Sequence, residues 1–133
     1  MRIQLLRADI TSMKVDAMVS PSESGEAESG ASLLCKFVIP LKVPPVAAAN
    51  AEEQLRSATM KALEHAESLA ISSVALPPMW TKGPADLERC ARNMVQAALD
   101  FRGRARSLQR VVFCVFGSST YEMFERALRD LDR

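Results

Sequence analysis

"NAEEQLRSATMKALEHAESLAISSVALPP", residues 50–78, holds a helix start, a helix and a buried strand in one run. Asn50 can cap the free amides of the first turn, and Glu53, three residues later, completes a capping-box pattern. From residue 55 to residue 69, apolar and small side chains recur at the spacing of one helical face. SVAL, residues 73–76, then forms an apolar strand that ends at two prolines. Because the apolar stripe needs a flat surface to cover, this stretch predicts a helix packed on a β-sheet.

The same alternation of strands and helices extends to both ends of the chain. In sequence order we predict strands at 3–6, 17–19, 33–43, 73–76 and 111–116, and helices at 50–69, 84–101 and 117–131. Pro40 limits the central pairing of the third strand. Strands that alternate with amphipathic helices imply right-handed crossovers and a mostly parallel sheet. We therefore predict a single α/β domain over residues 1–133, a length typical of one domain.

Composition and charge argue against several functional classes. The chain has 17 Lys and Arg against 16 Asp and Glu, so a net charge of +1 gives no bulk attraction to nucleic acid or anionic membrane. No window approaches the roughly 20 apolar residues of a membrane span, and the apolar run near the N-terminus is too short for a signal peptide. Three cysteines without a Cys-x-x-Cys pair do not form a disulfide framework. We expect a cytoplasmic protein with reduced thiols.

The residue types of common metal and nucleophile sites are sparse. His65 is the only histidine and no motif surrounds it, and the cysteines lack zinc-like spacing. RGRARSLQR, residues 102–110, carries four arginines that either grip a phosphate or form a solvated turn. The neutral overall charge favours the turn. We predict no metal site and no bound cofactor.

Three motifs have a recognisable order and spacing. The first is ADITSMKVDAMV (8–19), the second SGEAESGASLLCKFVIPLKVP (24–44), and the third VVFCVFGSSTYEMFERAL (111–128). They resemble macro domains, which have a Gly-Asp-Ile turn and Val-Asp-Ala-Ile-Val, a Thr-Gly-Glu-Ala strand, a Cys-Lys-Tyr-Val-Ile-His strand, and a similar last strand and helix. The resemblance implies a three-layer α/β/α sandwich of reduced size, with a mostly parallel mixed sheet that binds ADP-ribose or its derivatives at the strand ends.

The first candidate position is the turn after the first strand. The resemblance implies that Asp9 accepts a hydrogen bond from the adenine amino group, with Ile10 beside it. A carboxylate at a strand end can bind an exocyclic amine, and such a charged hydrogen bond contributes roughly 1.5–3 kcal/mol. The alternative is that Asp9 only caps a turn before Thr11 and Ser12.

The loop after the second strand departs from the family pattern. Ser20 and Ser22 stand where macro domains have Asn-Ala-Ala-Asn, a glycine run and a helix, and Pro21 between them cannot donate an amide. The chain then passes directly to an expected edge strand at 25–27. Because the family's paired Asn side chains support catalysis in its hydrolase branches, the departure implies weak or absent ADP-ribosyl hydrolase activity and no assigned catalytic residue.

The second phosphate loop of the family corresponds to residues 79–84. The candidate residues there are Trp80, Thr81, Lys82 and Gly83. Lys82 can act as a point charge, and Trp80 can stack on a base or ribose. The alternative, which we favour, is that Trp80 packs over the space left by the missing helix.

The last candidate position follows the strand VVFCVF. Phe116, Gly117 and Ser118 correspond to the place where the family often has an aromatic bordering the adenosine or distal ribose. Alternation along the strand puts Phe116 on one face with Cys114 and Val112, so core packing is the competing explanation.

Three functional hypotheses follow. The first is a binding module for ADP-ribose, a related adenosine nucleotide or an ADP-ribosylated macromolecule. The second is a ligand-free structural or interaction domain that forms a homodimer through the surface left by the missing helix. The third, the weakest, is a hydrolase with a relocated catalytic group.

Overall fold

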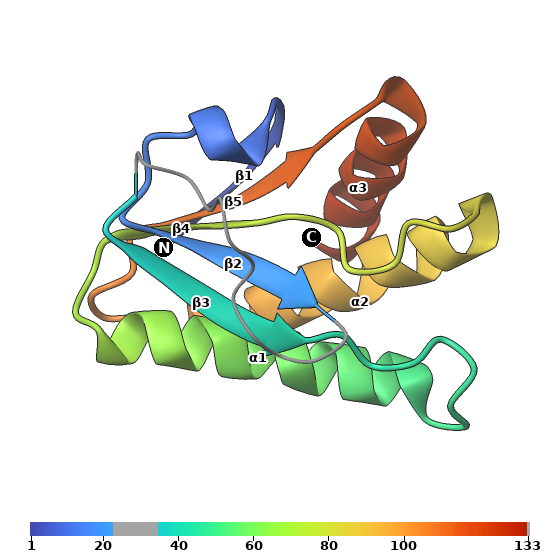
Figure 1. The fold of residues 1–133 in the computed structure, drawn as a ribbon, viewed down its shortest axis with the longest axis horizontal. Helices are drawn as coiled ribbons and strands as arrows, with labels where there is room; N and C mark the ends of the chain where they lie inside the picture. Colours follow the sequence, from blue (N-terminus) through green and yellow to red (C-terminus); the bar gives the residue numbers. More distant parts are fainter. Residues whose placement is uncertain (23–34, 133) are drawn as a thin grey trace.

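The structure is a computed structural model that describes residues 1–22 and 35–132. In chain order its elements are β1 (Arg2–Arg7), the 3-10 turn η1 (Ile10–Ser12), β2 (Ala17–Ser22), β3 (Phe37–Lys42), α1 (Ala51–Ser68), β4 (Ser73–Leu76), α2 (Pro84–Arg102), β5 (Arg110–Val115) and α3 (Ser118–Leu131) (Figure 1). The α/β class and the order of strands and helices predicted from the sequence are confirmed. Within the described residues, the strand predicted at 33–43 begins only at Phe37. The edge strand expected at 25–27 lies outside the described residues.

The described strands form one sheet in the order β1-β5-β4-β2-β3, and each neighbouring pair among them is parallel. Parallel neighbours cannot be joined by a tight turn, so α1 connects β3 to β4, and α2 connects β4 to β5. All carboxyl ends of the strands therefore meet at one edge of the sheet. This edge is where ligands of open α/β sheets bind.

The three α-helices gather on one face of the sheet, with α2 between α1 and α3 (Figure 1). Alternate residues of the strands point at them, so Val74 of β4 and Val111 of β5 share one buried cluster with side chains of all three helices. Phe113 and Phe124 meet there with ring centroids 5.4 Å apart.

A smaller cluster covers the opposite face of the sheet. Its buried members are Val15, Ala75 and Val112, and Ile10 of η1 packs against them. The second covering layer implied by the family resemblance is thus represented, in the described part of the chain, by η1 and the segment that follows it.

Two prolines lie inside strands, at positions where the sheet tolerates a missing N–H. Pro40 is in β3, which is an edge strand and pairs only with β2 in the described sheet. Pro21 is in β2, but β4 pairs with β2 only at Ala17 and Met18 and does not reach it. Neither proline interrupts a two-sided ladder.

The start of α1 differs from the predicted capping box. Asn50 stands at the N-cap, but its side chain makes no bond to a backbone amide. Its Oδ1 instead accepts a hydrogen bond from Gln54 Nε2 at 2.5 Å. The capping-box prediction is therefore wrong for this helix, although Glu52 and Glu53 still place favourable negative charge in the first turn.

Asp16 ties together the amino-terminal ends of three strands. Its carbonyl oxygen accepts the N–H groups of Lys36 and Phe37 before and at the start of β3. Its carboxylate accepts the N–H of Ser72 at 3.0 Å and the hydroxyl of Ser72 at 2.9 Å, beside β4. Hydrogen bonds from Ser72 are the main reason why the pKa of Asp16 lies below its usual value.

Candidate functional site

The ends of β1 and β5 are joined by hydrogen bonds at the carboxyl edge of the sheet. The N–H of Ala8 donates to the carbonyl of Val115 at 3.1 Å, and the thiol of Cys114 donates to the carbonyl of Ala8 at 3.0 Å. Asp9 lies two residues after the end of β1, and Phe116 follows β5 directly. The structure therefore brings together the first and last candidate positions, which lie more than a hundred residues apart in the chain.

Asp9 is an exposed residue at the start of η1. The turn is closed through its main chain, because its carbonyl accepts the N–H of Ser12 at 3.0 Å and the hydroxyl of Ser12 at 2.7 Å. Both of these bonds use the main-chain oxygen of Asp9. Ile10, in contrast, packs against the small cluster under η1.

The Asp9 carboxylate acts on the neighbouring thiol. Burial is the main cause that raises the pKa of Cys114, and the negative charge of Asp9 raises it further. The thiol of Cys114 consequently stays protonated at neutral pH, which suits its donation to the Ala8 carbonyl. Asp9 thus places a negative charge beside the joined ends of β1 and β5.

Phe116 projects from the molecule, with 73% of its surface exposed. The packing explanation is wrong for this residue, because β5 ends at Val115 and the ring lies beyond the cover of the core. Gly117 follows with a φ of +83°, a conformation that favours glycine, and it turns the chain into α3 at Ser118. An exposed ring thus stands between the end of β5 and the start of α3, at the same joined strand ends as Asp9.

The loop after β4 holds its aromatic residue differently. Trp80 is only 2% exposed, and its Nε1 donates to the carbonyl of Pro44 at 3.0 Å. The guanidinium of Arg89 lies 5.0 Å from the ring centroid, and the Cys90 sulfur accepts the N–H of Trp80 at 3.4 Å. These contacts show that Trp80 is packed in the main core, between the segment after β3 and α2. In the same loop Thr81 and Lys82 are exposed.

Gly83 is the N-cap of α2 and has an extended φ of 179°, so its conformation does not itself require glycine. Pro84 follows at the first position of the helix. This loop follows β4, which lies between β5 and β2 in the sheet. It therefore lies between Phe116, after β5, and the two serines at the end of β2.

Ser20 and Ser22 lie at the end of β2, two strands from β5. Ser20 is buried at 9% exposure, and Ser22 is partly buried. The carbonyl of Ser22 accepts the N–H of Val43 at 2.9 Å, which ties the end of β2 to the end of β3. The candidate residues therefore follow strands that end at one edge of the sheet, and the hydrogen bond from Ala8 to Val115 joins the two strand ends that precede Asp9 and Phe116.

The arginine-rich turn at 102–110 is organised by a carboxylate of α1. Glu67 accepts the N–H groups of Arg106 and Ser107 at 2.6 and 2.7 Å. These bonds, with that of Arg106 the largest cause, lower the pKa of Glu67 to about 2. Because the amides that would bind an anion already bind Glu67, this turn matches the structural interpretation.

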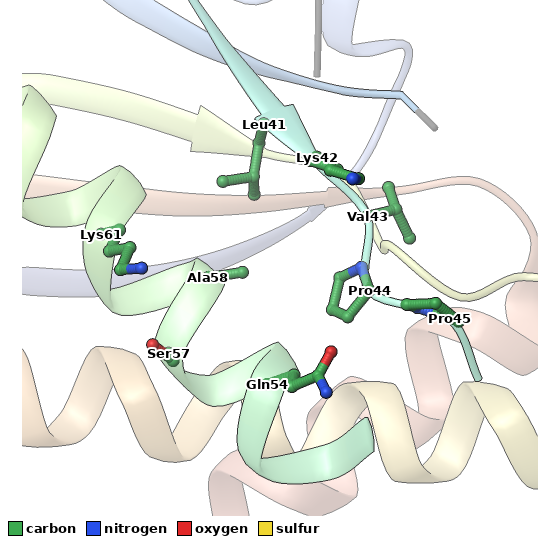
Figure 2. A pocket seen from close by; sticks show the side chains of 9 residues that line it. All are labelled: Leu41, Lys42, Val43, Pro44, Pro45, Gln54, Ser57, Ala58 and Lys61. Carbon is green, nitrogen blue, oxygen red and sulfur yellow. The ribbon is translucent and has the colours of Figure 1, made fainter. Parts of the chain in front are cut away.

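The sequence did not predict a cavity at the other edge of the sheet. It has a volume of about 460 Å³ and lies between the end of β3 and α1 (Figure 2). None of the candidate residues lines it. The sequence feature that could have indicated this cavity is the spacing of Gln54, Ala58 and Lys61. This spacing places the three residues on one face of a helix that follows two prolines.

The described residues form neither a metal site nor a membrane-spanning helix. No group of three or more His, Cys, Asp or Glu side chains there could hold a metal ion. No described helix combines the length and the apolar character needed to cross a bilayer.

Known proteins are similar to this chain in sequence and in fold. The family model of the macro domain matches residues 13–82. An uncharacterized protein of Saccharolobus solfataricus is 31% identical over 98 residues, which are 73% of this chain and 54% of that protein. The chain thus spans about half the length of that relative.

Two solved structures represent the similarity in fold. The Oceanobacillus iheyensis macrodomain with ADP superimposes with a TM-score of 0.82 at 18% identity, covering 96% of this chain and 90% of that one. The Trypanosoma brucei macrodomain in complex with ADP-ribose gives a TM-score of 0.78 at 16% identity, covering 95% of this chain and 68% of that one. At such identities the likeness shows the fold.

Proposed function

Because the chain belongs to the macro domain family, we propose that it is a binding module for ADP-ribose or a related adenosine nucleotide. The observation that carries the proposal is the 73% exposure of Phe116 beside Asp9, where β1 and β5 are hydrogen-bonded together. Structures of the same fold with ADP and with ADP-ribose support this class of ligand.

The chemistry of the two residues fits an adenine base. The ring of Phe116 can stack on a base face, and the carboxylate of Asp9 can accept a hydrogen bond from the exocyclic amine. Ser118 opens α3, whose uncapped first amides and positive dipole end favour an anionic group nearby. Thr81 and Lys82, after β4, supply exposed polar groups at the next strand end.

The proposal includes weak or absent ADP-ribosyl hydrolase activity. Ser20 and Ser22 stand at the start of the turn where the family has Asn-Ala-Ala-Asn, so the paired Asn side chains have no equivalent here, and Pro21 lacks the N–H that a phosphate-binding loop would use. A protein carrying ADP-ribose should therefore release no free ADP-ribose when incubated with this chain. Release above the rate without the chain would support the relocated catalytic group instead.

Calorimetric titration with ADP-ribose tests the binding proposal. We expect micromolar affinity, and we expect Asp9→Ala and Phe116→Ala each to weaken it at least tenfold, a loss of about 1.4 kcal/mol. Matched controls are Asp100→Ala, which removes an exposed acid from α2, and Phe37→Ala, which removes a ring that is 39% exposed on β3. Absence of heat, or equal losses in the controls, would contradict the assignment of this site.

A second candidate function is self-association. Leu6 of β1 is 40% exposed and lies in register with Cys114, two residues before Phe116. Two exposed apolar side chains beside an edge strand support an interface between two copies of the chain. In this alternative the chain is a dimer and gives no heat with ADP-ribose.

A further inference from the structure

The cavity between β3 and α1, named here the β3–α1 groove, has two walls. One wall is the end of β3 and the segment after it, with Leu41, Lys42, Val43, Pro44 and Pro45. The other is one face of α1, with Gln54, Ser57, Ala58 and Lys61. Figure 2 shows the side chains of Leu41, Gln54 and Lys61 directed into the space between the walls. Its volume of about 460 Å³ is in the range of small-molecule pockets.

The charges of the β3–α1 groove have one sign. Lys42 and Lys61 are both exposed, and no Asp or Glu is among the described residues that line the groove. Within the part of the chain that the structure describes, neither ammonium group is in an ion pair. Two positive charges without a carboxylate partner favour an anionic occupant.

Both walls of the groove carry apolar side chains: Leu41, Val43 and Ala58 are partly buried, and Pro44 is buried. Such a combination suits a ligand with an apolar body and a charged end, because the body removes apolar surface from water while the charge stays near the ammonium groups.

Hydrogen bonds to the main chain of Pro44 and Pro45 fix the wall that these prolines form. Trp80, buried under it, donates its Nε1 hydrogen to the carbonyl of Pro44. The carbonyl of Pro45 accepts the N–H of Ala48 at 3.2 Å, and each proline ring fixes its own φ. A wall that is rigid before binding lowers the entropy cost of taking up a ligand.

We propose that the β3–α1 groove binds a small organic anion, a carboxylate or a phosphate monoester with an apolar body. This site is separate from the proposed nucleotide site. β3 is the last strand of the order β1-β5-β4-β2-β3, whereas Asp9 and Phe116 follow β1 and β5 at the opposite side of the sheet. Binding at one site can therefore be measured without the other.

The test is a titration of the ¹⁵N-labelled chain with phenyl phosphate, benzoate and uncharged benzamide, followed by amide chemical shifts. We expect the anions to shift amides at 41–43 and 54–61 and to leave those of Asp9 and Phe116 unchanged. Lys42→Glu and Lys61→Glu should each weaken anion binding at least tenfold. The control Lys14→Glu, which changes an exposed lysine outside the groove, should alter it less than twofold.

Comparing phenyl phosphate with benzoate shows whether the groove prefers a phosphate monoester or a carboxylate. Tighter binding of either anion than of benzamide supports the proposal. Benzamide binding as tightly as benzoate would overturn it, because recognition would not depend on charge. Shifts centred on Asp9 and Phe116, or no shift with either anion, would overturn it as well. The spectrum of each variant without ligand shows directly whether its fold is retained.

Discussion

Glu67 and Asp16 show how single carboxylates organise the ends of this sheet. Glu67 reaches from α1 to the backbone amides of Arg106 and Ser107, which precede β5. Asp16 reaches from the start of β2 to Ser72, which precedes β4. Both acids bind main-chain groups near strand starts. They lie away from the candidate site, so their role is structural.

Glu67 gives a pH-dependent prediction. Folding lowers its pKa from 4.5 to about 2, so its contribution to stability is present above about pH 4.5 and is lost as the pH falls toward 2. Glu67→Gln should therefore lower the free energy of unfolding at pH 7, and the difference from the unmodified chain should vanish near pH 2. Urea unfolding at a series of pH values measures this.

Glu125→Gln is the control for this series, since Glu125 is an exposed glutamate of α3. Its effect on unfolding should be small at every pH. If Glu67→Gln lowers stability by the same amount at all pH values, the cause is packing and not the hydrogen bonds of the charged carboxylate.

At the scale of elements, the loop after β4 fastens the end of β3 to α2. Trp80 donates to Pro44, and Cys90 of α2 accepts the N–H groups of Met79 and Trp80. The edge strand β3 is thus held through the segment that follows it, beyond its pairing with β2. This fastening also supports one wall of the β3–α1 groove.

Trp80→Phe tests the fastening. The substitution keeps an aromatic ring but leaves the carbonyl of Pro44 without its donor, which costs about 1–3 kcal/mol in a buried setting. We expect the free energy of unfolding in urea to fall by that amount. The control Tyr121→Phe removes a hydroxyl from a partly buried residue of α3 and should cost less. Equal losses would show that the Trp80–Pro44 bond adds nothing.

At the scale of the whole molecule, the helices are distributed unevenly over the sheet. α1, α2 and α3 share one buried cluster, whereas the described residues place η1 and its neighbours on the other face. Leu6 and Phe116 remain exposed beside β1, which is an edge strand. The surface with Leu6 and Phe116 is thus the proposed site both for nucleotide binding and for self-association. Measurements in solution distinguish the two.

Light scattering gives the oligomeric state. The nucleotide-binding proposal predicts that the 133-residue chain has the monomer mass of 14.6 kDa at micromolar concentration. A mass twice as large, returned to the monomer value by Leu6→Ser, would favour the self-association candidate. The dimer must also fail to bind ADP-ribose for that candidate to replace the first.

Local periodicity was sufficient to predict most of the fold. The apolar stripe at 55–69 lies on α1 and the strand predicted at 73–76 is β4, whereas the strand predicted at 111–116 runs from 110 to 115 and leaves Phe116 outside it. The alternation of these elements implied the parallel sheet. These features depend on near neighbours in the chain, so a single sequence contains them. The family resemblance placed Asp9 and Phe116 at strand ends, but it did not determine how exposed either is.

Tertiary structure alone decided the rest, because the partners are far apart in the chain. Alternation suggested that Phe116 is packed, but exposure depends on whether the core extends past the end of β5, and it does not. Trp80 is buried against the segment of Pro44, 36 residues away in the chain. The hydrogen bonds of the Glu67 carboxylate likewise depend on the turn before β5, about 40 residues further along. The β3–α1 groove likewise exists only once β3 and α1 are packed. Thus the sequence by itself determined which elements form and in what order, while packing between distant elements decided which side chains remain available to a ligand.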